Sequence, residues 1–127
     1  MEFDTHLEAI ERESAALRSA ATRGPLDAVV PTCPDWTLEE LVRHVRNTQR
    51  WGMLNVQRAT PAAHVPFDEV GDAPKGPAVI DAFTAATAEL VSTLRKTGPD
   101  APVWTFRGPS VSRFWGRRAA LEVAMHR

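Results

Sequence analysis

The sequence predicts an all-α fold, a four-helix bundle with long connections. Three observations lead to this prediction. Apolar residues recur at alternating spacings of three and four over four segments, which is typical of amphipathic helices. Stretches with proline and glycine separate these segments, and no run alternates convincingly with period two, apart from the short run 103–106. Because two of the connections are long, we expect a non-sequential winding rather than tight helical hairpins.

The first helix is expected over residues 5–22. One face would carry an apolar stripe of Leu7, Ile10, Ser14, Leu17 and Ala21. Thr5 and Glu8 have the spacing of a capping box, in which a hydroxyl and a carboxylate each bind a free N–H of the first turn. The pair Gly24-Pro25 should end this helix.

The second helix is expected over residues 37–59, after a loop over residues 26–36 that contains two prolines. Thr37 and Glu40 form another capping-box pair, which indicates where this helix begins. Residues 60–77 hold four prolines and two glycines, so they are predicted to form an irregular connection.

The third helix is expected over residues 78–96. Its apolar face would consist of Val79, Phe83, Ala86, Leu90 and Leu94. Gly98 and Pro99 should end it, and a further loop leads to Pro109. A fourth helix is then predicted to begin at residue 110 or 112 and to be still running where the chain stops at Arg127.

Length and charge exclude several classes of function. A chain of 127 residues is one domain with a sizeable core, and a net charge of -1 argues against nucleic acid or an anionic membrane as the main partner. The longest apolar stretches are too short to cross a bilayer, and the first residues do not resemble a secretory signal. Cys33 is the only cysteine, which favours a reducing, cytoplasmic location.

A candidate metal site combines residues of the second and fourth helices. Glu122 and His126 are four residues apart and share one helical face with Arg118. His44 shares its face with Leu41, Thr48 and Trp51, and the inward faces of bundles are where metal sites are built. Two imidazoles and one carboxylate form a ligand set for catalytic zinc, with a fourth position open, and the set also suits non-haem iron. From spacing alone, an inward histidine that is a satisfied core residue is the more common alternative.

Two segments carry a family resemblance. They are PTCPDWTLEELVRHV, residues 31–45, and FWGRRAALEVAMHR, residues 114–127. Both are similar to signatures of the DinB/YfiT-like metalloenzyme superfamily, and more narrowly of the metal-binding N-terminal domain of actinobacterial mycothiol-dependent maleylpyruvate isomerases. The resemblance implies a DinB-like four-helix bundle over residues 1–127, as the N-terminal part of a longer family member. It also implies that the fourth helix is truncated at Arg127, in an excerpted chain or a degenerate member.

The resemblance further implies the chemistry. It makes His44, Glu122 and His126 the ligands of a divalent metal, usually zinc, and mycothiol the thiol cosubstrate. Zinc would hold the thiol as thiolate, for an isomerase or an S-transferase that acts on a small-molecule substrate. Arg118 either binds a substrate anion or orients Glu122, and an exposed arginine is an equally weighted alternative.

Two other functions stay open. One is a non-catalytic metal-binding or regulatory domain on the same fold, and the other is a metal-dependent hydrolase that activates water. A homodimer that covers the apolar face of an incomplete fourth helix is a further option.

Other side chains have structural interpretations that we favour. Trp36 is expected to attach its loop to the core, Cys33 to be structural, and His6 and His64 to lie on the surface. Trp104 and Trp115 could either form the wall of a pocket or pack in the core, and the sequence favours neither role. The C-terminal arginines are expected to form a solvated face; they are Arg107, Arg113, Arg117, Arg118 and Arg127.

Overall fold

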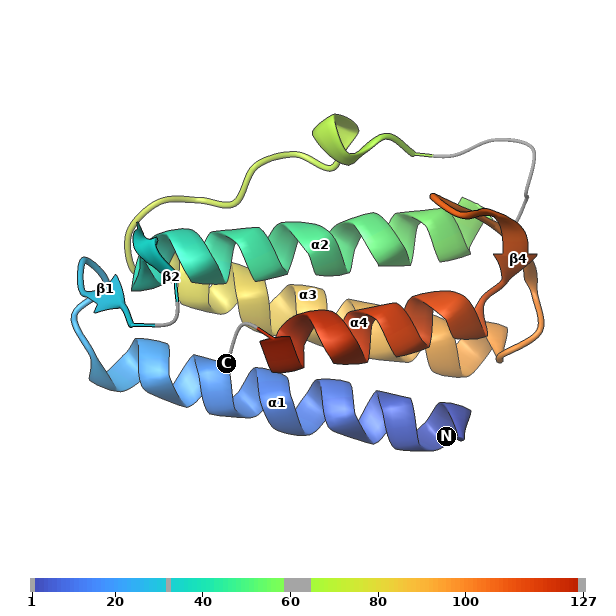
Figure 1. Cartoon of the computed structure of the whole chain (residues 1–127), viewed down its shortest axis with the longest axis horizontal. Helices are drawn as coiled ribbons and strands as arrows, with labels where there is room; N and C mark the ends of the chain where they lie inside the picture. Colours follow the sequence, from blue (N-terminus) through green and yellow to red (C-terminus); the bar gives the residue numbers. More distant parts are fainter. Residues whose placement is uncertain (1, 32, 59–64, 126–127) are drawn as a thin grey trace.

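The protein is a bundle of helices, as the sequence predicts (Figure 1). The computed structural model describes residues 2–31, 33–58 and 65–125. Within these residues the helices are α1 (Phe3–Arg23), α2 (Leu38–Arg58), α3 (Ala78–Thr97) and α4 (Arg113–Met125). None of the described helices is long and apolar enough to cross a membrane.

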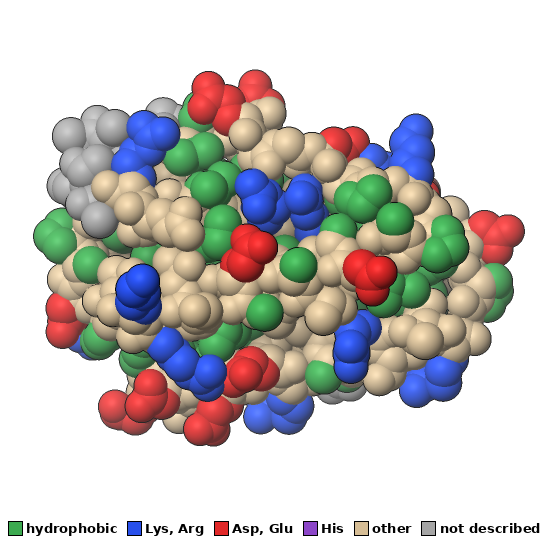
Figure 2. All heavy atoms as spheres, turned by 180° about the vertical axis from the view of Figure 1, so that it is seen from behind, with side chains coloured by type: hydrophobic (Ala, Val, Ile, Leu, Met, Phe, Trp, Pro, Cys, Tyr) green, Lys and Arg blue, Asp and Glu red, His purple; other side chains and the backbone are tan. Residues whose placement is uncertain are grey.

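The helices surround a common core. α2 packs most closely against α3, and α1 packs against α4 and α3, while α4 also contacts α2. The α2–α4 seam therefore lies on the opposite side of the bundle from the α1–α3 seam. Acidic and basic side chains are interspersed over the described part of the face shown in Figure 2, in keeping with the small net charge.

The apolar stripes of α1 and α3 are buried as predicted. The buried residues of α1 are Leu7, Ile10, Ser14, Leu17 and Ala21, and those of α3 are Val79, Phe83, Ala86, Leu90, Val91 and Leu94. Gly24 and Gly98 follow the last helical residues, and the left-handed φ of 79° at Gly98 is one that glycine adopts at little cost.

The predicted capping box at the start of α1 is wrong. α1 begins at Phe3, so that Thr5 and Glu8 lie inside the helix, and the residue before it makes no side-chain cap. The ring of Phe3 packs against the core and closely approaches Gly116 of α4. This tertiary contact explains why the helix begins earlier than its local signal indicates.

The capping box of α2 is confirmed. The Thr37 hydroxyl accepts a hydrogen bond from the Glu40 amide at 3.2 Å, and the Thr37 amide donates to Glu40 Oε1 at 3.0 Å. α2 begins directly afterwards, at Leu38. A local sequence signal therefore sets where α2 begins, and with it the helical turn on which His44 lies.

Two short hairpins correct the predicted loops. β1 (Val29–Val30) pairs with β2 (Cys33–Thr37) in the stretch expected to be a loop. β3 (Pro102–Thr105) pairs with β4 (Gly108–Val111). β3 overlaps the short run 103–106, the one stretch in which the sequence alternates with period two. A two-stranded hairpin has two free edges, so prolines can sit at positions where a central strand would need an N–H donor.

The described part of the long connection, residues 65–77, runs along the outer side of α2 and is called the strap below (Figure 1). It contains a single turn of 3-10 helix, η1 (Phe67–Glu69), and is otherwise irregular, as predicted. Arg43, Arg46 and Arg50 of α2 donate side-chain hydrogen bonds to its backbone carbonyls. The strap is thus attached to α2 over much of its length.

Candidate metal centre

His44 and Glu122 meet across the α2–α4 seam. His44 Nε2 lies 3.1 Å from Glu122 Oε1, although the two residues are 78 positions apart in the sequence. The Glu122 side chain is 10% exposed and that of His44 is 32% exposed. The fold therefore brings together two of the three predicted ligands between α2 and α4, with Glu122 largely buried and His44 partly exposed.

Arg118 lies one helical turn before Glu122 and binds its other carboxylate oxygen. Arg118 Nη2 is 3.0 Å from Glu122 Oε2, and the arginine side chain is 42% exposed. A buried carboxylate is costly unless it is paired, and Arg118 provides that charge. This contact is what the interpretation of Arg118 as a group that orients Glu122 requires, and it uses one of five N–H donors, so the interpretation in which Arg118 binds an anion stays open.

The two donor atoms are at hydrogen-bonding distance from each other, which is also close to the separation of two ligands on one metal ion. Two ligand atoms on one tetrahedral zinc ion lie roughly 3.3 Å apart, because each bond is about 2.0 Å long. The distance between His44 Nε2 and Glu122 Oε1 is 3.1 Å. His126, the third predicted ligand, lies outside the described residues, and within residues 2–31, 33–58 and 65–125 no group of three or more His, Cys, Asp or Glu is placed to hold a metal.

Trp36 borders the site. Its ring centroid lies 4.8 Å from that of the His44 imidazole, and it also packs against the core cluster that contains Leu41 and Val45. This packing agrees with the predicted role of Trp36 in attaching its segment to the core. The contact with His44 was not predicted, because helical periodicity says nothing about a residue that precedes the helix.

A small cavity opens beside the carboxylate. It has a volume of about 30 Å³ and is lined by Val45, Thr48, Gln49, Trp51, Gly52, Trp115, Arg118, Ala119, Glu122 and Val123. This is about the space that one water molecule takes up in the liquid. A small atom or group can therefore lie next to Glu122, with an aromatic wall on the other side.

That wall belongs to an aromatic cluster around Trp51. The ring centroid of Trp51 lies 5.1 Å from that of Trp115, 5.5 Å from that of Phe67 and 6.0 Å from that of Phe106. Trp115 is buried and its indole N–H donates to the Trp104 carbonyl at 2.9 Å, so it both packs in the core and lines the cavity. Phe67 and Phe106 were not predicted, because they lie in connections where no periodic pattern marks them.

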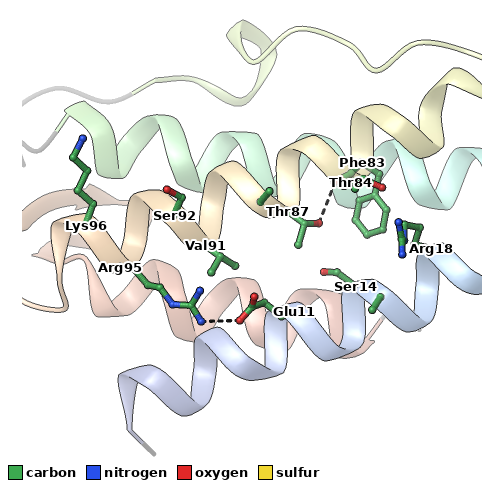
Figure 3. Close-up of a pocket in the computed structure, with 12 residues that line it drawn as sticks. Glu11, Ser14, Arg18, Phe83, Thr84, Thr87, Val91, Ser92, Arg95 and Lys96 are labelled. Atoms are coloured by element: carbon green, nitrogen blue, oxygen red, sulfur yellow. Dashed lines mark hydrogen bonds and ion pairs between the residues drawn. The ribbon is translucent and has the colours of Figure 1, made fainter.

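A larger groove, of about 790 Å³, lies along the α1–α3 seam (Figure 3). Its carboxylate, Glu11, is paired with Arg95 at 2.8 Å. The Thr87 hydroxyl donates to Gln49 Oε1 at 2.9 Å and to the Phe83 carbonyl at 3.1 Å. Since its lining contains neither histidine nor cysteine, this groove lacks the donors of a catalytic metal site.

The remaining candidates lie elsewhere. His6 is half-buried in a groove between α1 and α4 and not fully on the surface; burial lowers its pKa, and the Arg117 cation lowers it further. Arg117 is exposed on the far side of α4, as predicted. The side chain of Cys33 and the whole of His64 lie outside the described part of the chain.

Comparison with protein families agrees with the helical bundle. The family model described as the mycothiol maleylpyruvate isomerase N-terminal domain matches residues 7–127. The chain belongs to that family. A search of curated proteins and a search of solved structures found no match. Both α2 and α4 fall within the matched region.

Proposed function

We propose that this mycothiol maleylpyruvate isomerase N-terminal domain binds a divalent metal, zinc, through His44, Glu122 and His126. With mycothiol as cosubstrate, it would act as an isomerase or an S-transferase. The observation that carries the proposal is the 3.1 Å approach of His44 Nε2 and Glu122 Oε1 between two helices of the matched region. Family membership supports mycothiol as the thiol.

The residues around the site prepare it for this chemistry. Arg118 contacts Glu122 Oε2, and Glu122 Oε1 lies toward His44, so Oε1 is the oxygen that we propose as the ligand. Trp36 packs beside the imidazole, and a packed neighbour restricts the rotation of the ring. Zinc held by His44, Glu122 and His126 would supply the charge that keeps a thiol cosubstrate in its thiolate form near neutral pH.

The reaction follows from the nucleophile. The thiolate adds to one carbon of a cis double bond conjugated to a carbonyl, and the electron pair moves onto the carbonyl oxygen. Rotation about the resulting single bond and departure of the thiolate then give the trans product. An S-transferase would instead keep the new carbon–sulfur bond and protonate the neighbouring carbon.

Metal content tests the proposal. The untagged protein should contain about one zinc ion per chain by elemental analysis, because three protein ligands define one site. His44→Ala, Glu122→Gln and His126→Ala should each lose it, whereas the control His6→Ala should retain it. A wild-type protein that takes up no metal after zinc is added would contradict the proposal. Activity that needs no thiol would instead point to a hydrolase.

A further inference from the structure

Two exposed phenylalanines pack against Trp51, which lines the small cavity at Glu122. Phe67 is 42% exposed and Phe106 is 47% exposed, and within the described residues only Val29 and Leu121 are comparable large exposed hydrophobics. Phe67 comes from the strap and Phe106 from the turn between β3 and β4, yet both rings contact Trp51. A cluster of exposed aromatic rings beside a cavity is typical of a ligand-binding surface.

The strap holds Phe67 in place before any ligand binds. The Trp51 indole N–H donates to the Val65 carbonyl at 2.8 Å. Asn55 accepts a hydrogen bond from the Val65 amide at 2.9 Å and donates to its carbonyl at 3.3 Å. These bonds fix the start of the strap directly against α2, two residues before Phe67.

The β3–β4 turn holds Phe106 in the same way. The Thr105 hydroxyl donates to the Gly108 carbonyl at 2.6 Å and accepts from the Arg107 amide at 3.1 Å. The ring of Phe106 is stacked on Trp51 with an angle of 16° between the planes. Both exposed rings are therefore preorganised, which lowers the entropy cost of binding.

A cation lies next to this wall. Arg118 Cζ is 5.6 Å from the centroid of the Phe106 ring, while Arg118 Nη2 binds Glu122. A guanidinium has five N–H donors, and its fork geometry suits a carboxylate. Since 42% of the Arg118 side chain is exposed, an anion can reach it from solution.

We propose that Phe67, Phe106 and Trp51 form the wall that binds the flat ring of an aryl carboxylate substrate, and that Arg118 binds its carboxylate. With a double bond conjugated to a carbonyl between its ring and its anionic end, this substrate would be the electrophile of the reaction, so the inference deepens the proposed function and rests on it. The wall offers partly exposed aromatic rings beside one cation, which matches a flat ring that carries an anion. The hydroxyl groups of a sugar would instead need several hydrogen-bonding partners.

Binding can be measured without metal or thiol. The probe is 4-fluorocinnamate, a flat aryl carboxylate, titrated into the metal-free protein of residues 1–127 and followed by fluorine NMR. We expect saturable binding that cinnamate displaces. Fumarate, which lacks the ring, and benzyl alcohol, which lacks the charge, should displace it at least about ten-fold less well.

Matched variants identify the residues. Phe106→Ala should weaken binding by about 3- to 10-fold through lost ring contact, and Arg118→Gln by about ten-fold or more. Leu121→Ala removes an equally exposed apolar side chain, and Arg117→Gln removes the adjacent cation on the other side of α4. Both controls should bind like wild type, and circular dichroism checks that every variant is folded.

Three results would overturn the inference. They are the absence of saturable binding by the folded protein, displacement by fumarate or by benzyl alcohol as good as that by cinnamate, and equal losses in the controls and the test variants. Because the metal measurement is separate, a protein that binds zinc but not the probe refutes this inference alone. A protein that binds the probe but not zinc refutes the metal proposal, and the wall then remains as a binding surface without that chemistry.

Discussion

Gln49 carries a polar side chain into the centre of the bundle. It is 2% exposed, and Gln49 Nε2 donates to Ser14 Oγ at 3.1 Å while Thr87 Oγ1 donates to Gln49 Oε1 at 2.9 Å. These two bonds connect α2 to α1 and α3, and the side chains of Ser14 and Thr87 are visible in Figure 3. Gln49 also lines the small cavity at Glu122. Gln49 therefore both links three helices by hydrogen bonds and lines the cavity at the candidate site.

Gln49→Ala should lower the free energy of unfolding by about 2–4 kcal/mol, because it leaves a cavity and a buried Ser14 hydroxyl without its donor. Urea unfolding followed by circular dichroism measures this change. The matched control is Gln57→Ala at the exposed end of α2, where we expect a change within about 0.5 kcal/mol. Equal losses in the two variants would show that the buried network does not stabilise the bundle.

At the scale of elements, the start of α2 combines a side-chain cap with a hairpin. Leu38 and Glu39 donate their backbone N–H groups to the carbonyls of Ala28 and Leu26, at 2.8 Å and 2.9 Å. The first N–H groups of a helix have no partner within it, so these contacts replace the missing acceptors. These backbone contacts with the segment before β1 and the capping box together determine where α2 begins and hence which turn carries His44.

Thr37→Ala should lower the free energy of unfolding by about 1 kcal/mol, because it removes the hydroxyl of a working cap. Thr5→Ala is the matched control: Thr5 has the same capping-box spacing but lies exposed within α1, and we expect less than about 0.5 kcal/mol. Thermal unfolding of both variants provides the comparison. A larger loss for Thr5→Ala would contradict the assignment of the caps.

The same cap predicts a pH dependence. Hydrogen bonds from the Thr37 backbone and side chain lower the pKa of the Glu40 carboxyl below its ordinary value of 4.5. The contribution of Glu40 is therefore present above that value and is lost as pH falls through the lower pKa of the folded state. The difference in stability between wild type and Thr37→Ala should shrink in acid, and a difference that grows there would contradict this sign.

At the scale of the whole molecule, the strap encloses the outer side of α2 and positions Phe67 (Figure 1). Asp72 is its main ionic attachment: Asp72 Oδ2 lies 2.5 Å from Arg43 Nη2, and Oδ1 accepts from Asn47 Nδ2 at 3.2 Å. The hydrogen bond from Asn47 and the Arg43 cation lower the pKa of Asp72 below its ordinary value of 3.8. This attachment is present at neutral pH and is lost as pH falls through the lowered pKa.

Asp72→Ala should loosen the strap without unfolding the helices. We expect amide hydrogen exchange in residues 65–77 to become about two- to five-fold faster, the range for an exposed ion pair, while exchange in the helices stays unchanged. Asp68→Ala, on the same strap but outside these bonds, serves as the control. Faster exchange throughout the bundle would show instead that the strap is part of the cooperative core.

The sequence by itself determined the helices. Apolar spacing identified the buried faces of α1 and α3, and the Thr37–Glu40 pair marked the start of α2. These features depend on contacts within a few positions along the chain, which periodicity and capping motifs record directly.

The tertiary structure decided the rest. The early start of α1 depends on the packing of Phe3 against α4, and the 3.1 Å distance between His44 and Glu122 depends on how α2 and α4 approach each other. The meeting of Phe67 and Phe106 at Trp51 joins two connections from distant parts of the chain. Such contacts leave no periodic trace in the sequence, because their free energy comes from surfaces that exist only after the helices have packed.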